Sequence, residues 1–180
     1  MNDSELTGGA GMPDGWARLW APHRMSYIAG DNRPMPGNSV PCPFCEIHQK
    51  SDEEGLIVHR GAEAYVVMNL YPYNAGHILI CAYRHVADLT ELSDSERNEI
   101  SSLTAHAMKV LRKVSNASGF NLGMNQGAVS GAGVAAHIHQ HVVPRWGGDA
   151  NFMPIIGKTK VLPALLQETR QALADAWNLV

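Results

Sequence analysis

Short apolar runs separated by turn residues dominate the chain between positions 56 and 83. The segments 56–59, 64–70 and 77–83 are rich in Leu, Ile, Val and Tyr and have the length of strands. The last two flank the segment YPYNAG (71–76), whose Pro, Asn and Gly are typical of a turn. We therefore expect antiparallel strands joined as a meander.

The periodicity then changes to that of a helix. Apolar residues recur at spacings of three and four from Ile100 to Val114, and the preceding SDSE (93–96) has the form of a capping box. The pattern predicts a helix of about six turns that stops at Gly119. A second helix is predicted to begin near Pro163 and to continue through Leu165, Leu166, Leu173 and Trp177.

Two more strands are predicted between these helices. In FNLGMNQG (120–127) the residues Phe120, Leu122 and Met124 alternate with Asn and Gly, which is typical of a half-buried strand with a polar second face. The segment HIHQHVV (137–143) is predicted to be the next strand.

The length of 180 residues and a hydrophobic fraction of 45% fit one compact domain with tails. Residues 1–15 are polar and rich in Gly, as in a flexible tail. We expect residues 16–41 to form an extension that packs on the domain, residues 42–146 to form the domain itself, and residues 147–180 to form a C-terminal extension with a helix.

Charge and composition exclude several classes of partner. A formal charge of −3 gives no field that would hold nucleic acid or an anionic membrane. The chain has no apolar run of about 18 residues and no signal-peptide pattern. Three cysteines are too few for a secreted disulfide framework. We expect a cytoplasmic protein with no nucleic-acid or membrane partner.

The segment AAHIHQHVVPRW (135–146) places His137, His139 and His141 at every second position. In a strand these three side chains share one face. An imidazole is readily tuned near pH 7 as a nucleophile, a general acid or a metal ligand. Such a row therefore forms a metal platform or a surface that handles anions, unless it is only the polar face of a sheet.

The loop before the row, QGAVSGAGVAA (126–136), consists mainly of small residues. Small residues let backbone N–H groups approach an anion closely, and successive N–H groups can form an anion-binding nest. Its position directly before the histidines favours phosphate chemistry over a catalytic zinc with an open coordination position.

The pair Cys42 and Cys45, in CPFC, supplies half of a four-ligand zinc site. The alternatives are a redox pair, which lacks the βαβ context of a thioredoxin-like fold, or two buried thiols.

The segment HIHQHVVPR (137–145) resembles the motif of the histidine triad superfamily, His-x-His-x-His followed by apolar residues. The resemblance extends over about residues 40–146, through Asn69, the Gly76-His77 pair, Asn125 with Gly127, and CPFC. The flanking segments LWAPHRMSYI and PRWGGDANFMPIIGKTKVLP resemble extensions in a bacterial branch related to diadenosine tetraphosphate phosphorylases and hydrolases. The resemblance implies an α+β domain with an antiparallel sheet of about five strands, a long helix and a C-terminal helix.

The resemblance also implies roles for individual residues. His139 would be the nucleophile that attacks the α-phosphorus and forms a nucleotidyl-imidazole intermediate, while His141 and His77 would bind and polarise phosphate oxygens. The other expected substrate contacts are the backbone N–H groups of Ser130, Gly131 and Gly133 with the phosphates, Asn125 beside the phosphates, Asn69 with the sugar, and Phe44 and Ile47 with the base.

The implied activity is cleavage of dinucleoside polyphosphates, foremost diadenosine tetraphosphate, by phosphorolysis or hydrolysis. The acceptor stays open, because Gly133 stands where related phosphorylases carry a Ser. The implied partners are an adenine nucleotide or dinucleoside polyphosphate, inorganic phosphate, and further copies of the chain in a homodimer or higher homo-oligomer. The alternatives are a nucleoside phosphoramidate hydrolase, a nucleotide-binding regulator without turnover, and a metal-dependent hydrolase.

The resemblance completes the candidate zinc site with two histidines. In zinc-bearing bacterial members a histidine after the Gly-His strand and the first triad histidine join the two cysteines. The implied ligand set is Cys42, Cys45, His85 and His137, which would form a closed structural zinc site. No organic cofactor is expected.

Overall fold

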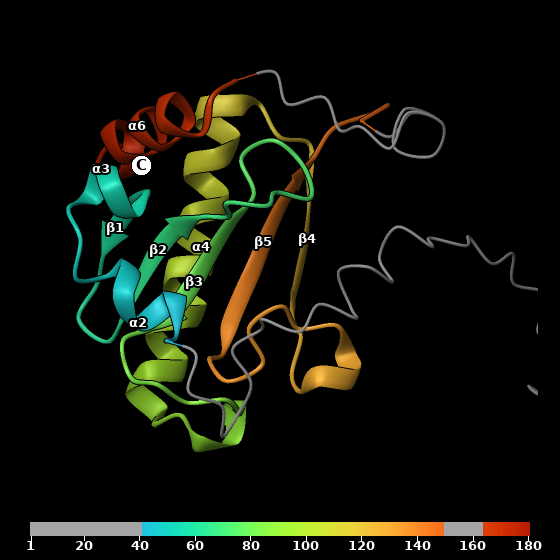
Figure 1. Ribbon diagram of the computed structural model, residues 1–180. Helices are drawn as coiled ribbons and strands as arrows, with labels where there is room; N and C mark the ends of the chain where they lie inside the picture. The colour runs from blue at the N-terminus through green and yellow to red at the C-terminus, as the bar shows by residue number, and fades with distance from the viewer. Residues whose placement is uncertain (1–40, 150–163) are drawn as a thin grey trace, which may run out of the picture.

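The computed structural model describes residues 41–149 and 164–180. The expected tail and nearly all of the N-terminal extension lie outside the described residues, as do residues 150–163. The described part has an α+β architecture, with one five-stranded antiparallel sheet in the order β1-β2-β3-β5-β4 (Figure 1). Its strands are β1 (Ile57–Arg60), β2 (Ala64–Met68), β3 (Ile78–Ala82), β4 (Gly119–Met124) and β5 (His139–Arg145).

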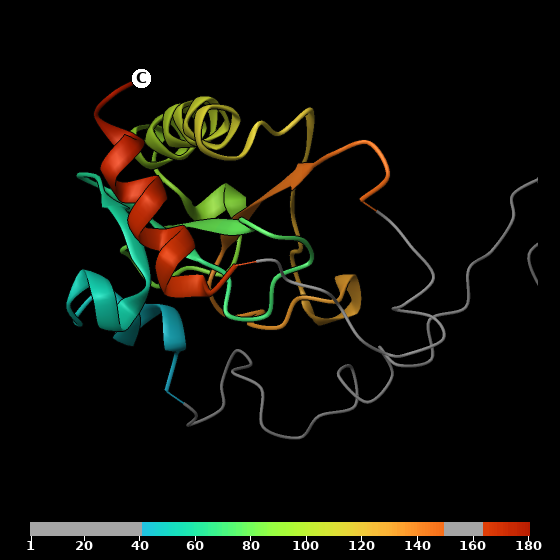
Figure 2. The ribbon, with the colours of Figure 1, turned by 90° about the horizontal axis from the view of Figure 1, so that it is seen from above.

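Helices cover both faces of the sheet. The long helix α4 (Asp94–Ser115) and the C-terminal helix α6 (Leu166–Trp177) share the larger apolar core with one face. The short helix α2 (Pro43–Ile47) lies on the other face, as Figure 2 shows. The remaining short elements are α3 (Asp52–Gly55) and the 3-10 helices η2 (Leu89–Glu91) and η3 (Ala128–Ser130). None of the described helices could span a membrane.

The strand register decides which residues stand on the α2 face. Cys81 on β3 lies opposite both Tyr65 on β2 and His139 on β5, and Leu79 lies opposite His141. Residues opposite one another in a sheet point to the same face. The two triad histidines of β5 therefore share their face with the smaller apolar cluster around Phe44, while Val142 joins the core under α4.

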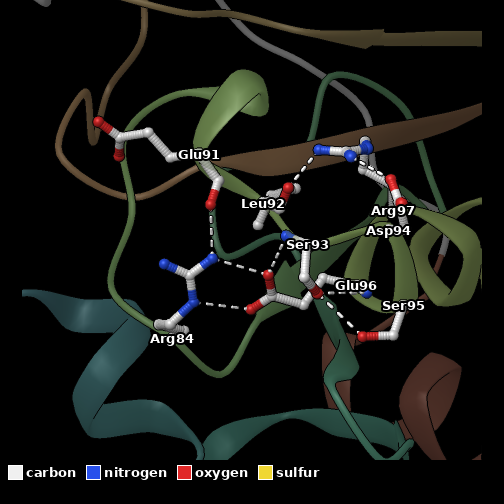
Figure 3. Close-up of polar contacts among 8 residues, drawn as sticks. All are labelled: Arg84, Glu91, Leu92, Ser93, Asp94, Ser95, Glu96 and Arg97. Atoms are coloured by element: carbon white, nitrogen blue, oxygen red, sulfur yellow. Dashed lines mark hydrogen bonds and ion pairs between the residues drawn. The ribbon is translucent and has the colours of Figure 1, made fainter.

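The predicted capping box is present at the start of α4. The Ser93 hydroxyl accepts a hydrogen bond from the Glu96 N–H at 3.2 Å, and the Glu96 carboxylate accepts one from the Ser93 N–H at 2.7 Å. Glu96 is buried and also accepts from Arg84 Nη2 at 2.7 Å and Nε at 3.0 Å (Figure 3). Its bonds to Arg84 are the main reason that the pKa of Glu96 falls to about 2. This carboxylate thus joins α4 to the segment that follows β3.

Two predicted helix boundaries were wrong. The helix α4 ends at Ser115 because Asn116 adopts the left-handed conformation (φ 53°), so Gly119 begins β4 rather than stopping the helix. Asn tolerates this conformation better than most residues with a Cβ. The C-terminal helix begins at Leu166, and Leu165 is its exposed N-cap.

Two strand predictions were also partly wrong. The strand β5 begins at His139, because the N–H of Ile138 donates to the Val86 carbonyl at 2.7 Å and His137 lies before the strand. In β4, Leu122 is 49% exposed although the alternation predicted it to be buried. The strand lies at the edge of the described sheet, where fewer neighbours cover it.

Candidate active site

His139 begins β5 and has its imidazole orientation fixed by a backbone atom. Its Nδ1 lies 2.8 Å from the carbonyl oxygen of His137. A carbonyl only accepts, so Nδ1 carries the proton and Nε2 keeps its lone pair. Burial lowers the pKa of His139, and the bond to His137 opposes this shift only partly. The residue is therefore a neutral imidazole with a nucleophilic Nε2.

A second backbone group fixes the protons on His77 and His141. The N–H of Tyr73 donates to His77 Nδ1 at 3.0 Å, so the proton of neutral His77 lies on Nε2. His77 Nε2 lies 2.9 Å from His141 Nδ1 and donates to it. His141 must then carry its own proton on Nε2. The sequence placed both histidines at the site, and the structure brings them into direct contact.

His141 presents this proton next to His139. The centroids of the two imidazole rings are 4.9 Å apart. His141 Nε2 is buried and has no hydrogen-bond partner among the described residues. Burial, followed by the neighbouring His139, lowers the pKa of His141 to about 4, which keeps it neutral at pH 7. A buried donor without a partner is costly to maintain, and a phosphate oxygen of a substrate would satisfy it.

Tyr73 belongs to the site although the sequence analysis treated it only as part of a turn. Its ring centroid lies 4.7 Å from that of His77. The ring also stacks on His141, with a centroid distance of 5.5 Å and an interplanar angle of 14°. Its side chain is half exposed. The position of an aromatic residue between Asn69 and His77 was the available signal, but the turn residues around it obscured that signal.

Asn69 supports His77. Its Oδ1 accepts from the N–H of Tyr71 at 2.9 Å, and its Nδ2 lies 3.2 Å from His77 Nδ1. This asparagine therefore holds the turn and the histidine, while its expected contact with a sugar stays a prediction. Asn125 is half-buried between β4 and η3, and its expected place beside the phosphates also stays a prediction.

The Gly-rich loop folds differently from an open nest at its first two predicted positions. The N–H groups of Ser130 and Gly131 donate to Gly127 O at 3.3 Å and Ala128 O at 3.2 Å, within η3. Ser130 Oγ also donates to Gly127 O, at 2.7 Å. These two N–H groups are thus occupied, and they would need a rearrangement of η3 to reach a phosphate. Gly133 lies beyond η3 and is half-buried.

Phe44 packs directly against His139. Its ring centroid is 4.8 Å from that of His139 and 5.5 Å from that of His137, and the residue is buried. Ile47, also from α2, packs against the same cluster and is partly buried. Phe44 therefore borders the triad. The expected contact of both residues with a base stays a prediction.

The four predicted metal ligands lie together. The ligand atoms of Cys42, Cys45, His85 and His137 are all within 4.8 Å of one another. Cys45 Sγ lies 3.2 Å from His85 Nδ1, and Cys42 Sγ lies 3.4 Å from His137 Nδ1. His137 donates from Nε2 to the Ala82 carbonyl at 2.8 Å, which leaves Nδ1 unprotonated toward the thiols. The donor set and its orientation fit a tetrahedral Cys2His2 metal site.

Comparison with known proteins identifies relatives of this chain. A family model described as the HIT domain matches residues 50–148. An AP-4-A phosphorylase of Mycobacterium tuberculosis is 49% identical over 172 residues, which cover 94% of this chain and 88% of the relative. An asymmetrical bis(5'-nucleosyl)-tetraphosphatase of Schizosaccharomyces pombe is 31% identical over 93 residues, which cover 52% of this chain and 50% of that protein.

Solved structures share the fold. A zinc-bound histidine triad family protein from Mycobacterium smegmatis superimposes with a TM-score of 0.62 at 23% identity, over 79% of this chain and 96% of that one. The family match spans more than half of the 180 residues and includes all three histidines of the row. The chain therefore belongs to the HIT domain family.

Proposed function

We propose that this protein cleaves dinucleoside polyphosphates, foremost diadenosine tetraphosphate, through a nucleotidyl intermediate on His139. The observation that carries the proposal is the bond from His139 Nδ1 to the His137 carbonyl, which leaves Nε2 free beside the unpartnered Nε2–H of His141. The M. tuberculosis relative named AP-4-A phosphorylase supports the choice of substrate, because its similarity covers nearly the whole chain.

The first step forms a bond between His139 Nε2 and the α-phosphorus. The bond from that phosphorus to the bridging oxygen breaks, and its electron pair leaves with the polyphosphate. Hydrogen bonds from His141 Nε2–H to a phosphate oxygen stabilise the charge that develops. Because the leaving group is a phosphate anion, it needs no proton from the neutral histidines.

The second step regenerates the imidazole. An unprotonated oxygen of inorganic phosphate, or a water molecule that releases its proton to the solvent, attacks the same phosphorus. The bond from phosphorus to nitrogen then breaks, and its electron pair returns to Nε2. Phosphate as the acceptor gives ADP and ATP from diadenosine tetraphosphate, whereas water gives AMP and ATP. A phosphoramidate substrate fits less well, because its amine leaving group requires a proton and the low pKa of His141 leaves that histidine neutral.

Product analysis tests this function. The protein is incubated with diadenosine tetraphosphate, with and without inorganic phosphate, and the products are identified by mass spectrometry beside the His139→Ala variant. We expect turnover by the wild type alone, with the appearance of ADP or AMP identifying the acceptor. Absence of turnover under both conditions would reject this substrate and favour a binding role.

We also propose that Cys42, Cys45, His85 and His137 hold a structural zinc ion. Their ligand atoms lie within 4.8 Å of one another, and four such donors would complete a tetrahedral shell with no open position for chemistry. When bound, zinc would contribute folding energy by joining the α2 segment to the start of β5. None of the three cysteines forms a disulfide bond, which is consistent with a protein of the reducing cytoplasm.

A homodimer is the proposed assembly, with β4 at the contact. The strand lies at the edge of the described sheet, and edge strands offer unpaired backbone groups. Leu122 and Met124 line a mainly apolar hollow together with Ile100 and Thr104 of α4. Light scattering tests the assembly, and Leu122→Glu is expected to shift the mass from dimer to monomer.

A further inference from the structure

The loop between β2 and β3 exposes three large side chains, and one of them, Tyr73, contacts His77 and His141. Leu70 is 60% exposed, Tyr71 75% and Tyr73 50%. We call residues 70–73 the aromatic loop. It contains no charged residue, and neither does the rest of the connection from 69 to 76. Exposed apolar patches of this kind commonly mark binding surfaces.

Hydrogen bonds and a buried proline fix the conformation of the loop, so its exposed side chains do not result from disorder. Pro72, between the two tyrosines, is buried. Asn69 Oδ1 accepts from the Tyr71 N–H, and Asn74 Nδ2 donates to the Pro144 carbonyl at 3.1 Å and to Asp149 Oδ2 at 2.8 Å. A surface already ordered before binding loses little conformational entropy when a ligand stacks on it.

The loop lies at one end of the row of histidines. It connects β2 with β3 and reaches β5 through the Asn74 contact (Figure 1). Tyr73 stacks on His141 and contacts His77, whereas Phe44 contacts His139 and His137. The two aromatic residues therefore flank the row from opposite ends. A substrate with a base at each end of a phosphate chain has the matching arrangement.

We infer that the aromatic loop binds the base of the leaving nucleotide, the one released together with the polyphosphate. The inference rests on the proposed function. The flat face of a base stacks on aromatic side chains with little dependence on its identity, and an uncharged loop suits a base better than a phosphate. Tyr71 would supply the most accessible ring, and Tyr73 would join the base site to the phosphate site.

Binding to a protein without the nucleophile tests the inference directly. The parent is His139→Ala, and calorimetry gives the Kd for diadenosine tetraphosphate and for adenosine 5′-tetraphosphate, which has the same phosphate chain but no second nucleoside. We expect Tyr71→Ala to raise the Kd for the dinucleotide about tenfold and to leave that of the mononucleotide unchanged. Tyr71→Phe keeps the ring and should leave both values unchanged.

Several results would overturn the inference. An equal loss of affinity for both ligands with Tyr71→Ala would place the loop at the transferred nucleoside. No loss of affinity for either ligand would also contradict the inference, as would a parent protein that binds both ligands equally or binds neither. A fall in molecular mass with Tyr71→Ala, without a change in the Kd ratio, would assign the loop to contact between copies. Failure of wild type to turn over substrate, with the Kd ratio changed as expected, would reject the enzyme and retain the base site.

Discussion

Two backbone groups decide where three histidines carry their protons. The His137 carbonyl holds the proton of His139 on Nδ1, and the Tyr73 N–H holds that of His77 on Nε2, which in turn fixes His141. Backbone amides neither gain nor lose protons near neutral pH. The lone pair of the nucleophile and the donor for a phosphate oxygen are therefore present together before any substrate binds.

The buried state of His141 makes stability depend on pH. Its pKa is about 4 in the folded chain and near 6.5 when exposed, so below 6.5 the unfolded chain binds a proton that the folded chain does not. The contribution of His141 to stability is complete above pH 6.5 and is lost as pH falls toward 4. We expect His141→Asn to lose less stability than wild type between pH 7.5 and 5, as measured by urea unfolding. Parallel losses in the two proteins would contradict the assigned neutral state.

At the level of the elements, the sequence predicted which segments form strands and helices but not all of their ends. The start of β5 depends on a hydrogen bond from Ile138 to Val86, and the exposure of Leu122 follows from the position of β4 at the sheet edge. Both features depend on tertiary contacts, which the local alternation of apolar and polar residues does not reveal. The capping box at Ser93, in contrast, is a local motif and was predicted correctly.

The sequence likewise predicted some features of the candidate site and not others. Motif spacing identified the row of histidines, and the family resemblance implied the four metal ligands that the structure brings together. It could not distinguish an open nest from the 3-10 turn at Ser130, because Gly-rich sequences permit both. It also missed Tyr73, whose stacking on His141 depends on how the turn folds back onto the sheet.

The carboxylate of Glu96 is the main polar link between α4 and the segment after β3. Glu96→Ala removes the acceptor of the Ser93 N–H and leaves Arg84 with the Glu91 carbonyl alone, and we expect a cost of about 2 kcal/mol in the free energy of unfolding. Glu96→Gln keeps one acceptor oxygen and should cost less. Guanidinium unfolding measures both.

A neighbouring ion pair provides the matched control. Asp94 pairs with Arg97 in the same turn, but its side chain is 91% exposed. Exposed pairs contribute little, so Asp94→Ala should cost less than about 1 kcal/mol. An equal cost for Asp94→Ala and Glu96→Ala would show that burial of the Glu96 network adds nothing.

For the molecule as a whole, the four proposed metal ligands come from three parts that are distant in sequence. Cys42 and Cys45 come from the α2 segment, His85 follows β3, and His137 precedes β5. The same His137 holds the nucleophile through its carbonyl. Loss of the metal should therefore loosen the catalytic strand indirectly, through the fold.

Removal of zinc is predicted to lower stability before it lowers activity. Cys42→Ser should reduce the zinc content, measured by elemental analysis, and lower the Tm by several degrees. Cys81→Ala is the control, because this buried cysteine lies outside the ligand group and its replacement should retain the zinc. Immediate loss of activity on chelation, with an unchanged Tm, would instead indicate a catalytic metal.

The stereochemistry at the attacked phosphorus tests the covalent His139 intermediate most directly. The substrate is a diadenosine tetraphosphate with sulfur at one non-bridging position of the α-phosphorus. The configuration at this phosphorus is determined in the product. If the acceptor is water rather than phosphate, isotopically labelled water makes the product chiral. Each displacement inverts the phosphorus, so two steps through His139 predict net retention. Net inversion would mean that the acceptor attacks the substrate directly, and it would contradict the intermediate.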